Sequence, residues 1–497
     1  MTNAKPTRSL ARRGFLRSCG LAAAAATLPL SFSMRRRALA QPRADQKFLF
    51  VITASGGGSI IDSFLPIAQS EAPNASAAES LVIYPDAAVE RPMGSAIKVV
   101  RNLPIEGPFQ SRFEQAQLVR NHYRDMCVVT VEGTSVNHVI AQKRAMTGAG
   151  IDGGRTLLEA MAMTHGEDLL LPNCNMANGG YLEPGDRADV PARMRSEIIA
   201  DPVLYSVSTH GYAGLPSAPS ADAIEQARGV RDRLDDASAF SRRHAASALR
   251  SRYLELRRDV LPQLEGQDLI HRLLMIRSSE AFPLDEYGLG LDAEQNAQLE
   301  RLLTVFPDLA SDQLQAQAAL GFLLARNGLT SAVGLGPSFA PNFLPDGRIP
   351  DTPIAFDYSH TNHVAAQNVM WSRVSMAIDG LVTLLKETPH GDGSMWDRSL
   401  VYVATDFGRT KERPRGSLSF SSGHHLNNGN LFLSPMLKGN RVFGGVDPAT
   451  CLTYGFDPLT GDPAPGTVMR EGHLYSLVAQ ALGIDFAGRY DMSGLIR

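Results

Sequence analysis

The sequence predicts an α/β protein in which a mostly parallel sheet is covered by helices on both faces. Apolar runs of strand length alternate with segments of helical periodicity. These runs are continuously apolar, which is typical of strands that are buried on both faces. Polar residues collect directly after several runs, where ligands of open α/β sheets bind. Strands are predicted at 47–54, 126–131, 169–171, 329–335, 399–405 and 430–435.

Helical periodicity dominates residues 217–326, which we interpret as an α-helical insertion. The α/β domain is then built from residues 41–216 and 327–497. Within that domain, helices are predicted at 139–146, 155–163, 361–386 and 473–482.

Residues 1–40 are typical of a twin-arginine signal peptide. Arg12–Leu16 is the export motif, Leu21–Leu30 is a short apolar core, and Ala38–Ala40 is a small-x-small cleavage site. An N-terminal amphipathic helix is the alternative interpretation. We expect a periplasmic or secreted protein whose partner during export is the twin-arginine translocase.

Charge and hydropathy exclude some function classes. Residues 1–40 hold Lys5, seven arginines and no acid, so removing these eight charges takes the formal net charge from −3 to −11. No basic stripe indicates nucleic-acid binding. No later segment has eighteen consecutive apolar residues, so we expect no membrane span in the mature chain. Cys127, Cys174 and Cys451 have no close spacing, which disfavours a cysteine-based zinc site and leaves one disulfide open.

The best candidates for a metal site are carboxylates and histidines that follow predicted strands. Asp357 and His360 come after 329–335, and Asp406 comes directly after 399–405. His425 ends a polar loop. Carboxylate oxygens and imidazole nitrogens bind divalent cations such as zinc, calcium or magnesium. The pattern predicts a shared site, and the alternative is that each side chain is simply solvated.

Other strand ends carry further candidates. The glycine run 55–59 brings backbone amides to the end of 47–54, where they would favour an anion or form a plain turn. Asp62, just beyond, is placed to reach that end of the sheet. Thr134 and Ser135 lie before a predicted helix, where either would serve as a nucleophile or only as an N-cap.

Three more polar residues have candidate roles near these loops. Arg409 is a candidate clamp for a tetrahedral anion, or a structural ion pair. His138 is expected to steer the substrate or to cap its loop. His363 is expected to support the site or to lie exposed on the following helix.

The motifs together resemble the domain of unknown function 1501 family, within the alkaline phosphatase and sulfatase superfamily. The resemblance runs in order from about residue 47 to the C-terminus, apart from the helical stretch. It rests on the twin-arginine start, the glycine run, Asn137-His138 before Ala141-Gln142, Phe356-Asp357-x-x-His360, Asp406-Phe407-Gly408-Arg409-Thr410, and Gly423-His424-His425 followed by Gly444-Gly445.

The resemblance implies an alkaline-phosphatase-like site for one or two divalent cations. By motif position, Asp357, His360 and His425 match the ligands of one metal. Asp406 matches an acidic ligand of the other, with Asp62 as a weaker candidate. The nucleophile of the superfamily falls in the loop 134–137.

Three positions depart from the superfamily pattern. Phe407 replaces a histidine after the fourth strand, Asn137 replaces a serine, and His424 replaces an aspartate. We expect an exported metal-dependent hydrolase that acts on a small anionic substrate, a phosphate or sulfate ester. The departures favour an alternative, a non-catalytic binding or envelope-associated protein with a degenerate metal site.

Overall fold

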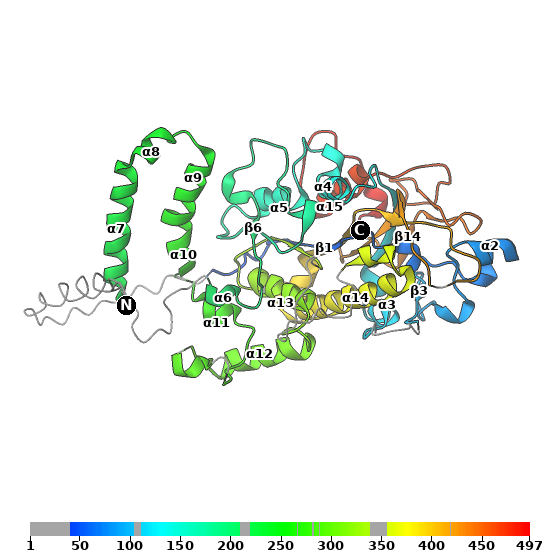
Figure 1. Cartoon of the computed structure of the whole chain (residues 1–497), viewed down its shortest axis with the longest axis horizontal. Coiled ribbons are helices and arrows are strands. Elements are labelled where there is room, and N and C mark those ends of the chain that lie inside the picture. Colours follow the sequence, from blue (N-terminus) through cyan, green and yellow to red (C-terminus); the bar gives the residue numbers. More distant parts are fainter. Residues whose placement is uncertain are drawn as a thin grey trace, which may run out of the picture. The chain divides into compact units, whose positions relative to one another are not determined.

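An eight-stranded mixed sheet forms the centre of the computed structural model (Figure 1). The structure describes residues 40–103, 111–208, 219–265, 267–280, 283–287, 289–337, 355–417 and 419–497. The predicted signal peptide therefore lies outside the described residues, apart from Ala40. The strands of the sheet are β1 (Phe48–Ala54), β4 (Met126–Glu132), β5 (Asn173–Asn175), β6 (Glu197–Ile198), β7 (Ala332–Leu335), β10 (Ser399–Thr405), β13 (Asn427–Leu433) and β14 (Arg441–Phe443).

The strand order is β14-β4-β13-β10-β1-β7-β5-β6. Only β13 runs antiparallel to its neighbours, β4 and β10, and every other adjacent pair in this sheet is parallel. The predicted α/β class with a mostly parallel sheet is confirmed. One consequence matters for the site: β13 begins at the edge where β1, β4, β7 and β10 end.

Both faces of the sheet are buried. In β1, Phe48, Phe50 and Ile52 pack into one hydrophobic cluster, while Leu49 and Val51 pack into the other. Each large apolar side chain buried in this way contributes about 1.5–3 kcal/mol to the free energy of folding. One face is covered by α3 (Gln115–His122), α13 (Gln313–Arg326) and α14 (His363–Glu387), and the other by α4 (His138–Thr147), α5 (Leu157–His165) and α15 (Glu471–Leu482) (Figure 1).

The strand predicted at 169–171 is wrong, because β5 lies four residues later, at Asn173–Asn175. Its sequence, Asn-Cys-Asn, carries no apolar signal. The asparagine side chains are nonetheless buried, since Asn173 Nδ2 donates to the Met194 carbonyl and Asn175 Nδ2 donates to the Tyr181 carbonyl. Satisfied amides of this kind let polar residues occupy a buried strand.

Helices fill most of the stretch predicted as an insertion, and the division into domains stays a prediction. α13 lies within that stretch and packs against α14 and β7. The predicted long helix over 223–261 is interrupted, because Ser238 caps a new helix by accepting from Ser241 N at 3.0 Å. The other elements here are α7 (Ala221–Ala237), α8 (Ala239–Arg243), α9 (Ala248–Glu255), η8 (Leu256–Val260), α10 (Leu261–Glu265), α11 (Leu269–Leu273) and α12 (Ala293–Val305).

None of the helices in the described ranges is both long and apolar enough to cross a membrane. Cys127, Cys174 and Cys451 are buried and free.

Candidate metal centre

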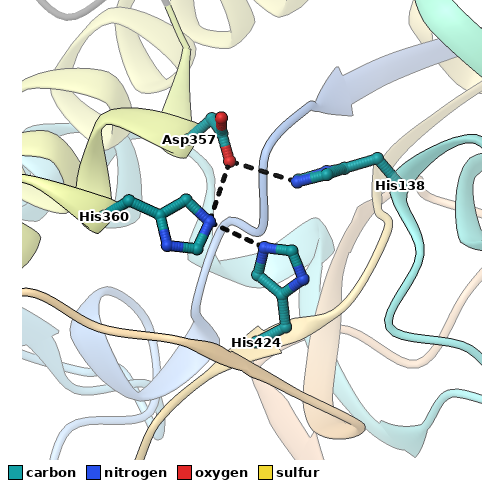
Figure 2. A group of neighbouring side chains, drawn as sticks. All are labelled: His138, Asp357, His360 and His424. Atoms are coloured by element: carbon teal, nitrogen blue, oxygen red, sulfur yellow. Dashed lines mark hydrogen bonds and ion pairs between the residues drawn. The ribbon is translucent and has the colours of Figure 1, made fainter.

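Four side chains from distant parts of the sequence point toward one another at one place (Figure 2). They are His138, Asp357, His360 and His424, and we call them the metal group. Each offers one ligand atom, and these atoms lie within 4.8 Å of one another. Because zinc–nitrogen bonds are about 2.0–2.1 Å, the most distant of these atoms would have to move closer together to share one ion.

The sheet topology explains this convergence. His138 begins α4, just after β4 ends. Asp357 and His360 lie on η10 (Phe356–His360), after β7. His424 lies on β12 (His424–His425), directly before β13. Because β13 is antiparallel, its beginning meets the carboxyl ends of the parallel strands, where ligand sites of α/β sheets form.

The contacts within the group are short. His138 Nε2 lies 3.1 Å from Asp357 Oδ1, and His360 Nε2 lies 3.3 Å from the same oxygen. His360 Nε2 and His424 Nε2 are 2.7 Å apart. The side chains of His138, Asp357 and His360 are 27%, 38% and 43% exposed, so the group is open to solvent.

Two imidazoles are oriented by contacts on their other ring nitrogen. His138 Nδ1 lies 2.8 Å from Asp406 Oδ2, and His424 Nδ1 lies 2.7 Å from the carbonyl oxygen of Val136. Because both partners are acceptors, Nδ1 carries the hydrogen and Nε2 of a neutral ring presents a lone pair to the group. Partners of this kind orient metal-binding histidines.

Lone pairs face one another in the group when His360 carries its hydrogen on Nδ1. His360 Nε2 accepts from Arg409 Nη1 at 3.2 Å, so it has no hydrogen to donate to His424. His424 has its hydrogen on Nδ1, facing Val136. A cation between these nitrogens removes their repulsion, and the donor set therefore fits a metal ion.

Charges around the group shift pKa values in opposite directions. Burial alone would lower the pKa of His138, but hydrogen bonds to two carboxylates outweigh it and raise that pKa to about 9. The contact with His138 lowers the pKa of Asp357 to about 2, against the effect of burial. Burial lowers the pKa of His360 and of His424, and the positive charge of Arg409 lowers both further. Neutral imidazoles and an ionised carboxylate are the forms that bind metals, so His138 has to release a proton when an ion binds, whereas His360, His424 and Asp357 do not.

Asp406, predicted as a ligand, lies behind His138 rather than in the metal group. Its two carboxylate oxygens accept from Gly56 N at 3.2 Å and Gly57 N at 2.6 Å. The backbone amides of the glycine run, which were predicted to bind an anion, thus donate to a carboxylate of the chain itself. Gly56 and Gly57 have φ of +92° and +83°, a conformation that favours glycine.

Arg409, predicted as an anion clamp, is fully buried next to the group. Its guanidinium lies 3.3 Å from Asp357 Oδ1 and donates to the carbonyl oxygens of Gly56, Phe356 and Ser422. These contacts tie three loops of the site together. The clamp role stays a prediction.

Phe407, one of the departures from the superfamily pattern, packs against the metal group. Its ring stacks on His424 at 4.0 Å between centroids and lies 4.7 Å from the ring of His138. It is 1% exposed. An apolar side chain therefore supports two imidazoles where the superfamily has a further histidine.

The two predicted nucleophiles have partners outside the group. Thr134 Oγ1 donates to Glu471 Oε1 at 2.7 Å. Ser135 Oγ accepts from Asn137 N at 3.1 Å, and Asn137 itself caps α4 by accepting from Ile140 N. Their catalytic role stays a prediction.

His425 and Asp62 also lie apart from the group, and their ligand roles stay predictions. His425 Nδ1 accepts from Asn427 N at 3.1 Å. Asp62 is buried, with Oδ1 at 2.5 Å from the Tyr84 hydroxyl and 3.0 Å from His363 Nε2. His363 is therefore buried rather than exposed, in a separate polar cluster.

Sequence reasoning singled out Asp357 and His360 but overlooked His424. Successive side chains of a strand point to opposite faces, so of two adjacent histidines on β12 one reaches the group. Which of the two does so depends on the register of β12 with β11 (Gly408–Arg409), where Arg409 pairs with His424. The sequence predicts that His138 steers the substrate or caps its loop, whereas its position after a buried strand is the signal for a ligand.

The comparisons with known proteins give distant structural likenesses and no sequence match. No protein-family model and no curated protein sequence matches the chain. Among solved structures, the chain is similar to a phosphonate monoester hydrolase from Silicibacter pomeroyi, with a TM-score of 0.31 and 10% identity. That match covers 88% of this chain and 74% of the hydrolase. It is too distant to carry a conclusion about the site.

Proposed function

We propose that this chain is an exported, metal-dependent hydrolase of phosphate or sulfate esters on an alkaline-phosphatase-like fold. The observation that supports it best is the solvent-open convergence of three imidazoles and one carboxylate at the carboxyl edge of the sheet. The ordered resemblance of the motifs to the domain of unknown function 1501 family supports the ester class.

In this proposal the four residues of the metal group hold one divalent cation. Three nitrogens and one oxygen favour zinc or another first-row transition metal over calcium or magnesium, which prefer oxygen ligands. When bound, the cation polarises an ester oxygen and lowers the pKa of water. Asp406 keeps His138 oriented, and Arg409 keeps Asp357 in place.

The nucleophile in this proposal is the hydroxyl of Ser135 or Thr134. Ser135 is the freer of the two to turn, because Thr134 is bonded to Glu471 through both its hydroxyl and its backbone amide. If the Ser135→Ala and Thr134→Val variants still hydrolyse the ester, we would infer that water is the nucleophile.

A second candidate function is a binding protein with no turnover. The number of ligands favours this binding protein, because four side chains fill all four positions of a tetrahedral metal site, as in structural zinc sites. A catalytic zinc usually keeps one position for water or substrate. For turnover, one of the four would have to leave the ion.

Metal analysis combined with ester assays tests the proposal. The purified chain should hold one equivalent of metal and hydrolyse p-nitrophenyl phosphate or p-nitrophenyl sulfate. Asp357→Ala should lose both the metal and the turnover, whereas the exposed carboxylate variant Asp392→Ala should keep them. Stoichiometric metal without turnover on either ester would favour the binding protein. Metal-free, inert protein would contradict both candidates.

A further inference from the structure

The stretch from α7 to α10 forms a helical hairpin with a distinctive turn. Three ion pairs hold α7 to the returning helices: Arg257 to Asp232 at 2.6 Å, Arg258 to Asp236 at 2.9 Å and Arg228 to Glu265 at 2.5 Å. Arg228, early in α7, pairs with Glu265 at the end of the return, whereas Asp236, late in α7, also lies 3.7 Å from Arg250 at its start, so the two arms are antiparallel. Figure 1 shows them side by side in green, with α8 at the turn. We call residues 239–254 the hairpin tip.

The hairpin tip has a charge opposite to that of the chain. It carries four arginines, Arg242, Arg243, Arg250 and Arg252, together with His244 and no acidic residue, although Arg250 pairs with Asp236 just outside it at 3.7 Å. The whole chain has a formal net charge of −3. Arg242 and Arg243 are exposed, on α8 at the turn itself. The hairpin tip is therefore a local site of attraction for anions.

The same residues expose large apolar side chains. Leu249 is 81% exposed, Phe240 68% and Tyr253 55%. Single exposed apolar residues are common. Phe240 and Leu249, close in sequence to the exposed Arg242 and Arg243, combine the apolar and basic residue types that bind at a membrane interface.

We propose that the hairpin tip docks on a bilayer that contains anionic phospholipids. Phe240 and Leu249 enter the region between head groups and acyl chains, while Arg242 and Arg243 pair with lipid phosphates. A bilayer uses both features of the tip. An acidic protein surface would use the arginines and leave the two apolar side chains without a role. This proposal is independent of the proposed hydrolase activity.

Tryptophan fluorescence at the tip tests the docking in the full chain. Phe240→Trp places a reporter on the tip, and Leu459→Trp places a matched reporter at a 58% exposed site elsewhere. Both are mixed with vesicles of equal parts phosphatidylcholine and phosphatidylglycerol, with and without brominated acyl chains. We expect a blue shift and quenching by bromine for position 240 only, lost in pure phosphatidylcholine and weakened by salt.

Loss of function provides the second measurement. Phe240→Ser with Leu249→Ser, and separately Arg242→Gln with Arg243→Gln, should each weaken vesicle binding at least tenfold. Leu459→Ser and Arg91→Gln are the matched controls, and circular dichroism checks that each variant is folded.

Two outcomes would overturn the docking. The first is a tryptophan at position 240 that bromine leaves unquenched. The second is tip-dependent binding to polyglutamate with no binding to vesicles, which would assign the tip to an acidic protein partner.

Discussion

Three of the four residues of the metal group are oriented by a contact with a residue outside the group. Asp406 holds His138, the Val136 carbonyl holds His424, and Arg409 holds Asp357. The sequence could identify the carboxylate and imidazole types and the loops that carry them. It could not choose between His424 and His425, because that choice depends on which face of a short strand turns toward the site.

The adjacent histidines of β12 give a direct test at this scale. His424→Ala removes a ligand atom and the ring that stacks on Phe407, so we expect a fall in metal affinity beyond the about 10–100-fold that loss of a supporting partner costs. His425→Ala should change the affinity little. Competition with a chromogenic chelator measures both. If His425→Ala weakens metal binding more than His424→Ala, then His425 is the ligand, as its motif position implies.

Gly56 gives a second residue-scale prediction. An added Cβ would overlap the backbone of Asp357, and φ is +92°. Gly56→Ala should therefore destabilise by more than the about 1–3 kcal/mol of backbone strain alone. Gly466→Ala is the matched control, because its φ is +93° and nothing lies within 4 Å. Equal urea midpoints for the two variants would argue against close packing at Gly56.

At the scale of elements, β13 brings the parts of the site together. The sequence predicted β10 at its true bounds, since seven consecutive apolar or small residues mark a buried strand. It placed the start of β13 three residues late, at Asn430. The missed residues, Asn427-Asn428-Gly429, have no apolar signal, yet they lie buried because their polar groups are bonded to neighbouring loops.

Asn428 carries a prediction at this scale. Its Nδ2 donates to the carbonyl oxygens of Gly58 and Phe407, and its Oδ1 accepts from Ile60 N. Asn428→Ala leaves those buried groups without partners, at about 1–3 kcal/mol for each unsatisfied group. We expect a lower unfolding midpoint together with weaker metal binding, because the loops lose their common anchor. The exposed variant Asn296→Ala should change neither the unfolding midpoint nor the metal affinity. If Asn428→Ala folds and binds metal as tightly as the unaltered protein, β13 does not help to position the metal group.

Buried and half-buried histidines outside the metal group give the molecule a pH dependence of stability. Burial lowers the pKa of His165, His390 and His473 below the ordinary value of about 6.5. In the window below pH 6.5 the unfolded chain binds more protons than the folded one, so stability rises with pH there. The stabilisation is fully present above about pH 6.5 and is lost as the pH falls through the folded-state values.

We therefore expect the urea midpoint to fall between pH 7 and pH 5. His165→Gln should flatten that dependence, because it removes one of these groups, whereas the exposed variant His244→Gln should not. A midpoint that is independent of pH, or that rises on acidification, would contradict this assignment.

The antiparallel strand β13 of the central sheet also determines when the site is completed during synthesis of the chain. During synthesis His138 is made early and His424 late, and β13 lies between β4, which is made long before it, and β10, which is made shortly before it. Until β13 enters that gap, three ligands exist without the fourth, and the central sheet lacks the strand that joins two of its parts. A chain released before residue 424 would hold its ion more weakly. Full metal occupancy would thus mark the molecules whose folding is complete.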